Sequence, residues 1–282
     1  MHAKIPAPEL VARLHAAGCV FAMEEAALLT RESATPEILE ERLRRRCAGD
    51  PLEQILGWAG FYGLRVPIAP GVFIPRRRTE LLAGRAVAEL AVAELAVGEL
   101  AGRPRPLLIE LCCGSGAVTL AVAAHTVSPF ESYAVDIHCA AVRCARLNLA
   151  GTATVLEGDL FSPLPVQLRG RVDVVVANAP YIPTGQLGTV PREARDHEPA
   201  ATLDGGTDGL DVLRRIITQA PQWLRRKGCL LLECSERQAD EVAAAIAAHH
   251  LVPEIVRNEV TDATVAVGRK QPETPCTSEP PE

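Results

Sequence analysis

An asparagine stands where an apolar run ends, in the stretch VVVANAPYIPT at residues 174–184. The amide of Asn178 offers an oxygen acceptor and an NH2 donor at this point. One interpretation is that the amide is placed to hold a ligand. The alternative is a buried strand that ends in a turn, since Asn followed by Pro favours turns. The groups that lie beside this loop must decide between the two.

A second candidate is the Gly-containing turn in IELCCGSGA, at residues 109–117. Gly114 and Gly116 follow an apolar run and precede a helical pattern, and glycine lets the backbone turn tightly and approach a ligand closely. A dinucleotide-binding fingerprint would need a third glycine, but Thr119 stands there. A Gly-x-Gly turn alone is a weak signal, and a plain tight turn also accounts for it.

Acidic residues strengthen the ligand interpretation. Asp136 ends the next predicted strand and Asp159 the one after it. The carboxyl ends of parallel strands meet at one edge of a sheet, and a carboxylate there can accept both hydroxyls of an adenosine ribose. The Gly turn lacks the Lys-Ser/Thr of a phosphate-binding loop. We therefore expect a nucleoside without phosphate, and S-adenosylmethionine fits because its sulfonium and amino groups are attracted by acidic strand ends.

The elements that would position these groups alternate along the chain. Strand patterns at residues 107–111, 132–136, 153–159, 171–178 and 228–234 are separated by helical patterns, and two more strand patterns follow at 253–260 and 263–269. This alternation predicts an α/β fold, a mostly parallel seven-stranded sheet with helices on both faces. The last strand follows another strand directly, so we expect it to insert as an antiparallel hairpin partner.

The remaining segments differ in character. Residues 1–50 have apolar positions at helical spacing and predict a small helical domain, and residues 51–76 are aromatic, Gly- and Pro-rich and predict a hairpin linker. The α/β domain would span residues 77–270. Residues 271–282 are rich in Pro and Glu, and we expect a disordered tail.

Composition excludes several classes of function. The net charge is −6 over 282 residues, so we expect neither membrane binding nor direct nucleic-acid binding. The nine cysteines contain no Cys-x-x-Cys pair, so we expect no metal site and reduced thiols. The N-terminal residues have no apolar segment typical of a signal peptide, and no run is long enough to span a membrane. We expect a cytoplasmic protein and a monomer.

From about residue 40 to 269, the chain resembles the bacterial release factor glutamine N5-methyltransferases, a family of class I (Rossmann-like) S-adenosylmethionine-dependent methyltransferases. The resemblance rests on the segment 49–82, which contains GDPLEQILG and IPRRRTE, and on GDLFSPL, NAPYI, HEPAATLDGGTDGLD and LLLE. It implies methyl transfer to a glutamine side-chain nitrogen of a protein, a peptide chain release factor, which the N-terminal helices would help to present.

Carried over by position, the family motifs imply two sets of residues. The catalytic set is Asn178, Ala179, Pro180 and Tyr181. The cofactor-binding set is Glu110, Gly114, Gly116, Asp136, Asp159, Leu160 and Asn178.

The chain departs from the family pattern at several positions. The family usually has Pro at 179, Gly at 112 and Pro-Glu or Pro-Asp at 77–78, where this chain has Ala, Cys and Arg77-Arg78. Leu160 stands where the family often has an aromatic residue.

The chemistry explains why the loop needs these residue types. A glutamine amide nitrogen is a poor nucleophile because its lone pair is delocalised into the carbonyl. Two acceptors on its hydrogens, the side-chain oxygen of Asn178 and the carbonyl of Ala179, would fix it and favour its developing charge. Tyr181 would pack on the amide. Two alternatives remain open, namely an amino-nitrogen methyltransferase for a small metabolite or a nucleic-acid base, and a weakly active cofactor-binding paralogue.

Overall fold

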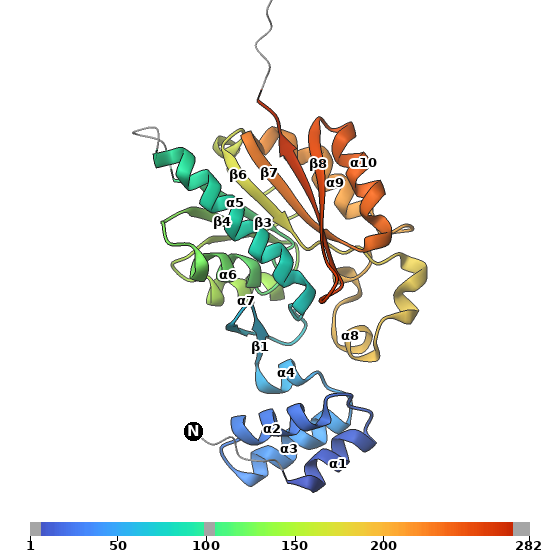
Figure 1. The fold of residues 1–282 in the computed structure, drawn as a ribbon. Helices are drawn as coiled ribbons and strands as arrows, with labels where there is room; N and C mark the ends of the chain where they lie inside the picture. The colour runs from blue at the N-terminus through green and yellow to red at the C-terminus, as the bar shows by residue number, and fades with distance from the viewer. Residues whose placement is uncertain (1–6, 99–104, 273–282) are drawn as a thin grey trace, which may run out of the picture.

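The computed structural model describes residues 7–98 and 105–272. Figure 1 shows an α/β unit with a group of small helices below it, joined by a short hairpin. The predicted disordered tail lies outside the described residues except for its first two positions.

Seven strands form one sheet in the order β5-β4-β3-β6-β7-β9-β8, which confirms the predicted mostly parallel sheet. The five strands from β5 to β7 run parallel, and β9 inserts antiparallel between β7 and β8, as expected for the last strand. The strands are β3 (Leu107–Leu111), β4 (Glu131–Asp136), β5 (Thr154–Glu157), β6 (Val172–Ala177), β7 (Leu224–Cys234), β8 (Leu251–Asn258) and β9 (Ala263–Lys270).

Helices cover both faces of this sheet (Figure 1). Neighbouring residues of a strand point to opposite faces, so Leu108 packs in one apolar cluster with α5 and α6, while Ile109 packs in another with α9 and α10. A third cluster joins α7 to β4 and β5. The helices are α5 (Glu80–Gly98), α6 (Ala117–His125), α7 (Cys139–Asn148), α8 (Arg192–His197), α9 (Asp211–Trp223) and α10 (Ala239–Ala248).

The N-terminal helices have an apolar cluster of their own, centred on Leu14, Leu29 and Leu43. These helices are α1 (Pro8–Ala16), α2 (Ala22–Glu32), α3 (Pro36–Cys47) and α4 (Leu52–Leu56), and the hairpin consists of β1 (Trp58–Phe61) and β2 (Leu64–Pro67). Helix α4 lies inside the predicted hairpin linker, because Leu52, Ile55 and Leu56 recur at helical spacing and face this cluster. The boundary between the two units at residue 50 stays a prediction.

Gly116 marks the point where the Gly turn becomes helix α6. Its φ is 76°, in the left-handed region, and a Cβ there would lie 2.7 Å from Cδ1 of Leu149. Both the backbone conformation and the contact with α7 therefore require glycine at this position.

We predict that Gly116→Ala lowers the free energy of unfolding by about 2 kcal/mol or more, since it combines a left-handed non-glycine residue with overpacking. Urea unfolding followed by circular dichroism measures the difference. The matched control is Gly185→Ala, where a Cβ meets nothing within 4 Å and φ is not positive. Equal losses for the two variants would contradict the assigned constraint.

Candidate active site

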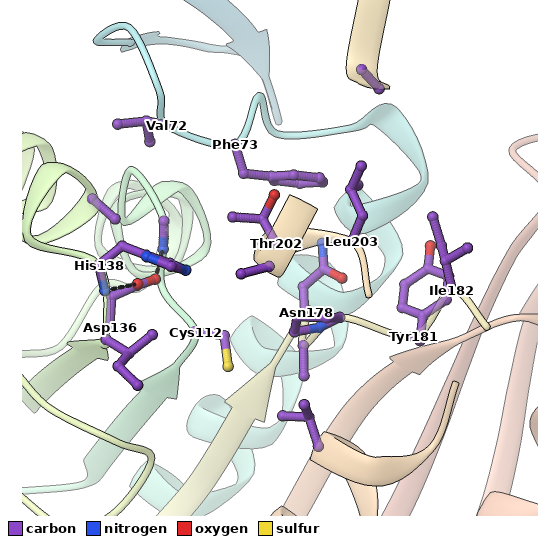
Figure 2. A pocket seen from close by; sticks show the side chains of 18 of the residues that line it. Val72, Phe73, Cys112, Asp136, His138, Asn178, Tyr181, Ile182, Thr202 and Leu203 are labelled. Atoms are coloured by element: carbon purple, nitrogen blue, oxygen red, sulfur yellow. Dashed lines mark hydrogen bonds between the residues drawn. The ribbon is translucent and has the colours of Figure 1, made fainter. Parts of the chain in front are cut away.

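A cavity of about 760 Å³ lies at the carboxyl ends of β3, β4, β5 and β6. Its wall is completed by the loop at residues 71–78 and by a segment at 190–203 that contains α8. Figure 2 shows Asp136 and His138 on one side of this cavity, with Asn178 and Tyr181 on the other. The cavity thus joins the two groups of residues that the sequence singled out.

The Gly turn and Asp136 form one hydrogen-bonded unit. The N–H of Gly114 donates to Oδ2 of Asp136 at 2.9 Å, and the N–H of His138 donates to Oδ1, also at 2.9 Å (Figure 2). Gly114 has a φ of 54° and a Cβ there would meet nothing within 4 Å. Since both residues line the cavity, the carboxylate is held rigidly and the turn leaves free space for a ligand.

Asp159 and Leu160 line the cavity beside this unit. The carboxylate of Asp159 pairs with the guanidinium of Arg215, which extends from α9. Leu160 is buried and adopts a φ of 49°, which is uncommon for a non-glycine residue. Only Oδ2 of Asp159 takes part in this ion pair, and both side chains are about half exposed.

Glu110 and Gly116 do not line the cavity, in contrast to the other predicted cofactor residues. The Glu110 carboxylate is buried beneath the turn and accepts from both the backbone N–H and the hydroxyl of Thr119, in the first turn of α6. Burial raises the pKa of Glu110 to about 7. Its geometry supports a role in holding α6 against β3, rather than the direct cofactor contact that we expected.

Cys112 occupies a position with φ of 52°, between Leu111 and the Gly turn. It is partly buried and lines the cavity, whereas Cys113 packs in the apolar cluster with α7. Burial raises the pKa of the Cys112 thiol well above its usual range, which favours the neutral thiol.

The loop after β6 carries Asn178, Ala179, Pro180 and Tyr181, and all four line the cavity. Nδ2 of Asn178 donates to Oγ1 of Thr79 at 3.2 Å. The hydroxyl of Tyr181 donates to Oε1 of the buried Glu233 at 3.1 Å. The side chains of Asn178 and Tyr181 are therefore both held by hydrogen bonds to residues outside the loop.

The cavity wall is tied together by Glu198. Its Oε1 accepts from the backbone N–H of Ile74 at 3.2 Å and from the guanidinium of Arg76 at 2.5 Å. The carboxyl group is buried, which raises its pKa. The IPRRR and HEP segments, far apart in the sequence, thus meet over the cavity.

Several cavity residues were not predicted from the sequence. They are Phe73, Arg78, His138, Thr202 and Leu203. Phe73 and Arg78 belong to the family-like segment 49–82, and Thr202 and Leu203 belong to the family-like segment HEPAATLDGGTDGLD, so their positions in those segments were an available signal. No local pattern distinguished His138.

Among the described residues, no group of three or more His, Cys, Asp or Glu side chains could hold a metal ion. A search of the same residues finds no helix with the length and apolar character of a membrane span.

Comparison with known proteins identifies the type of protein. Residues 95–182 match the family model described as ribosomal protein L11 methyltransferase (PrmA). The release factor glutamine methyltransferase of Streptomyces coelicolor is 38% identical over 203 residues, which cover 72% of this chain and 69% of that protein.

Two further similarities are informative, one to a relative and one to a solved structure. The 4-amino-L-phenylalanine/4-methylamino-L-phenylalanine methyltransferase of Streptomyces pristinaespiralis is also 38% identical over 203 residues, covering 72% of this chain and 67% of that protein. Among solved structures, the hMettl16 catalytic domain in complex with MAT2A 3'UTR hairpin 6 superposes with a TM-score of 0.53 at 13% identity, covering 82% of each chain. This last similarity concerns the fold alone. The sequence relationship shows that the chain belongs to the release factor glutamine methyltransferase family of S-adenosylmethionine-dependent enzymes.

Proposed function

We propose that this protein methylates a glutamine side-chain nitrogen of a peptide chain release factor. The observation that carries the proposal is the position of Asn178 and Tyr181 in the same cavity as Gly114 and Asp136. An acceptor site for an amide therefore adjoins a site suited to a nucleoside. Relatives named as release factor glutamine methyltransferases support the choice of substrate.

The cofactor would occupy the side of the cavity formed by Gly114 and Asp136. The open space at Gly114 admits a ligand against the backbone, and the Asp136 carboxylate suits the ribose hydroxyls. Leu160 and Cys112 add apolar wall beside them. S-adenosylmethionine, when bound, supplies a methyl group activated by a sulfonium.

The loop after β6 would hold the acceptor. The side-chain oxygen of Asn178 and the carbonyl of Ala179 accept the two hydrogens of the glutamine NH2, which fixes the nitrogen and favours the positive charge that it gains. Tyr181 packs against the planar amide. Catalysis then consists mainly of alignment, without a general base before transfer.

The N-terminal helices would help to present the protein substrate. Arg46 on α3 bonds Glu25 within this group of helices and also donates to Glu193 on α8 at 2.5 Å. Glu193 lines the cavity. On the outside of the same helices, Val20, Phe21 and Met23 are exposed apolar residues. The N-terminal helices are thus joined to the acceptor side of the cavity through Arg46 and Glu193, and their exposed apolar residues offer contacts to a partner.

A second candidate is methyl transfer to the amino nitrogen of a small amino acid. The guanidinium of Arg78 lines the cavity and interacts with Tyr181, at a position where the family usually has an acidic residue. A cation there suits the carboxylate of a free amino acid. The relative named 4-amino-L-phenylalanine/4-methylamino-L-phenylalanine methyltransferase is 38% identical to this chain, the same identity as the release factor glutamine methyltransferase of Streptomyces coelicolor.

We predict transfer of a labelled methyl group from S-adenosylmethionine to one glutamine of a purified release factor, located by mass spectrometry. Parallel reactions contain 4-amino-L-phenylalanine, or a release factor in which that glutamine is replaced by Asn. Label on the free amino acid and none on the release factor would favour the second candidate and reject the first.

We predict that Asp136→Asn weakens cofactor binding about tenfold or more. An amide in place of the carboxylate presents a donor to one of the two backbone N–H groups and loses charge-assisted hydrogen bonds. Isothermal titration with S-adenosylhomocysteine measures the change. Asp240→Asn, an exposed position at the start of α10, is the matched control. Unchanged affinity in Asp136→Asn would remove this residue from the cofactor site.

We predict that Asn178→Ala leaves cofactor affinity within about threefold of wild type but lowers turnover at least about a hundredfold, as expected when one positioned hydrogen-bonding group is lost. Single-turnover transfer to the acceptor that the wild-type chain uses measures this effect. Asn258→Ala, at the end of β8, serves as the control. Turnover within about tenfold of wild type would show that Asn178 does not hold the acceptor.

A further inference from the structure

We propose that Arg78 is a specificity-determining residue that binds a carboxylate carried by the acceptor, close to the nitrogen that is methylated. The inference rests on the proposed function, since it concerns the acceptor side of the same cavity. It adds one chemical group to the description of the acceptor. That carboxylate belongs either to an acidic residue next to the glutamine of a protein or to a free amino acid.

Most charged side chains that line the cavity have a partner of opposite charge. The pairs are Arg76 with Glu198, Arg215 with Asp159, and Glu193 with Arg46. Asp136 instead accepts hydrogen bonds from two backbone N–H groups. Arg78 lines the cavity as well, but its guanidinium forms no ion pair with any of the described residues. It is therefore a cation of the cavity that lacks a counter-charge from the chain.

Arg78 stands on the acceptor side of the cavity. It precedes Thr79, whose Oγ1 accepts from Nδ2 of Asn178 at 3.2 Å. Burial raises the pKa of Tyr181, and the charge of Arg78 opposes that rise, as expected for a cation near the phenol. Arg78 is also exposed, so a ligand that enters the cavity can reach its guanidinium.

The buried carboxyl group of Glu233, behind Tyr181, forms no hydrogen bond with Arg78. Its Oε1 accepts from the hydroxyl of Tyr181 at 3.1 Å, and its Oε2 has no partner among the described residues. Burial raises the pKa of Glu233, which favours the neutral carboxyl group and weakens it as a counter-charge. The anion that pairs with Arg78 is therefore one that enters the cavity.

An anion on the acceptor serves the reaction in two ways. The acceptor nitrogen gains positive charge when it receives the methyl group, and an unpaired cation nearby opposes that charge. A carboxylate held by Arg78 offsets this repulsion and fixes the acceptor at a second point besides Asn178. Arginine suits this role because its planar guanidinium binds a carboxylate through two parallel hydrogen bonds.

The experiment compares acceptors that differ only in this group. One pair is 4-amino-L-phenylalanine and its carboxamide. The other is a pair of peptides in which Asp or Asn flanks the acceptor glutamine. The pair in which the carboxylate member is preferred identifies the source of the carboxylate. The quantity measured is the ratio of the kcat/KM values of the two members, because a general loss of activity cancels in it.

We expect the wild-type chain to prefer the carboxylate member of one pair, and Arg78→Met to lower the ratio at least about tenfold, since charge-assisted hydrogen bonds are lost. Arg78→Glu should reverse the preference. The matched control is Arg77→Met, because Arg77 is exposed beside Arg78 but does not line the cavity. Urea unfolding checks that each variant folds. A ratio that is the same in Arg78→Met as in the wild-type chain would overturn the proposal.

A second measurement needs no turnover. Isothermal titration of the same acceptors into the chain saturated with S-adenosylhomocysteine gives the ratio of their affinities. Equal or undetectable binding of both members of each pair to the wild-type chain also contradicts the proposal. If the wild-type chain leaves release factor unmodified, the proposed function fails, and these affinities still decide the role of Arg78.

The cofactor carries a carboxylate of its own, so its binding is tested separately. The affinity of each variant for S-adenosylhomocysteine is compared with its affinity for 5′-methylthioadenosine, which lacks the amino-acid group. We expect Arg78→Met to leave the ratio of these two affinities within about threefold of wild type. A loss confined to S-adenosylhomocysteine would assign Arg78 to the cofactor and reject its role toward the acceptor.

Discussion

The pairing of β3 with β6 places the two halves of the site side by side. Leu111 and Ala177, the last residues of these strands, are partners in the parallel register, so Cys112 and Asn178 leave the sheet next to each other. On its other edge β3 pairs with β4, which ends at Asp136. The order of strands reverses between β3 and β6, and ligands of open parallel sheets bind at such a point. Cofactor and acceptor groups are thereby brought within one or two strand spacings, about 5–10 Å.

Hydrogen bonds between segments far apart in the sequence hold the loops that form the rest of the cavity wall. Glu198 holds the loop at residues 71–78, and Glu233 holds the loop after β6 through Tyr181. Both carboxyl groups are buried, and each has one oxygen without a hydrogen-bond partner among the described residues. Burial of a carboxyl group is costly unless its hydrogen bonds are made. The unpartnered oxygens of Glu198 and Glu233 therefore lower the stability of the folded state, while their carboxyl groups hold the cavity walls in a fixed arrangement.

Much of the fold followed from local pattern. The strand that ends at Leu111, the tight turn at Gly114 and the helix after it each have a signal within a few residues, and parallel strands then bring Asp136 to the same edge. The direction in which each side chain points could not be predicted in this way. Glu110 was expected to face the cofactor, but its carboxyl group turns to Thr119, because a buried carboxyl group next to a helix N-terminus finds two donors there. The partners of the loop side chains were also not predictable, since Thr79, which contacts Asn178, and Glu233, which contacts Tyr181, lie in separate segments that only the tertiary fold brings together.

Cys112 bears on a side reaction that every methyltransferase must avoid. Its sulfur is a softer and better nucleophile than an amide nitrogen, and it lines the cavity in which a methyl donor would bind. Only the thiolate attacks such a carbon efficiently. Burial raises the pKa of the Cys112 thiol, which disfavours the thiolate and with it methylation of the enzyme at this position. The surroundings of the cysteine that replaces glycine in the turn therefore favour the less reactive thiol beside an electrophilic cofactor.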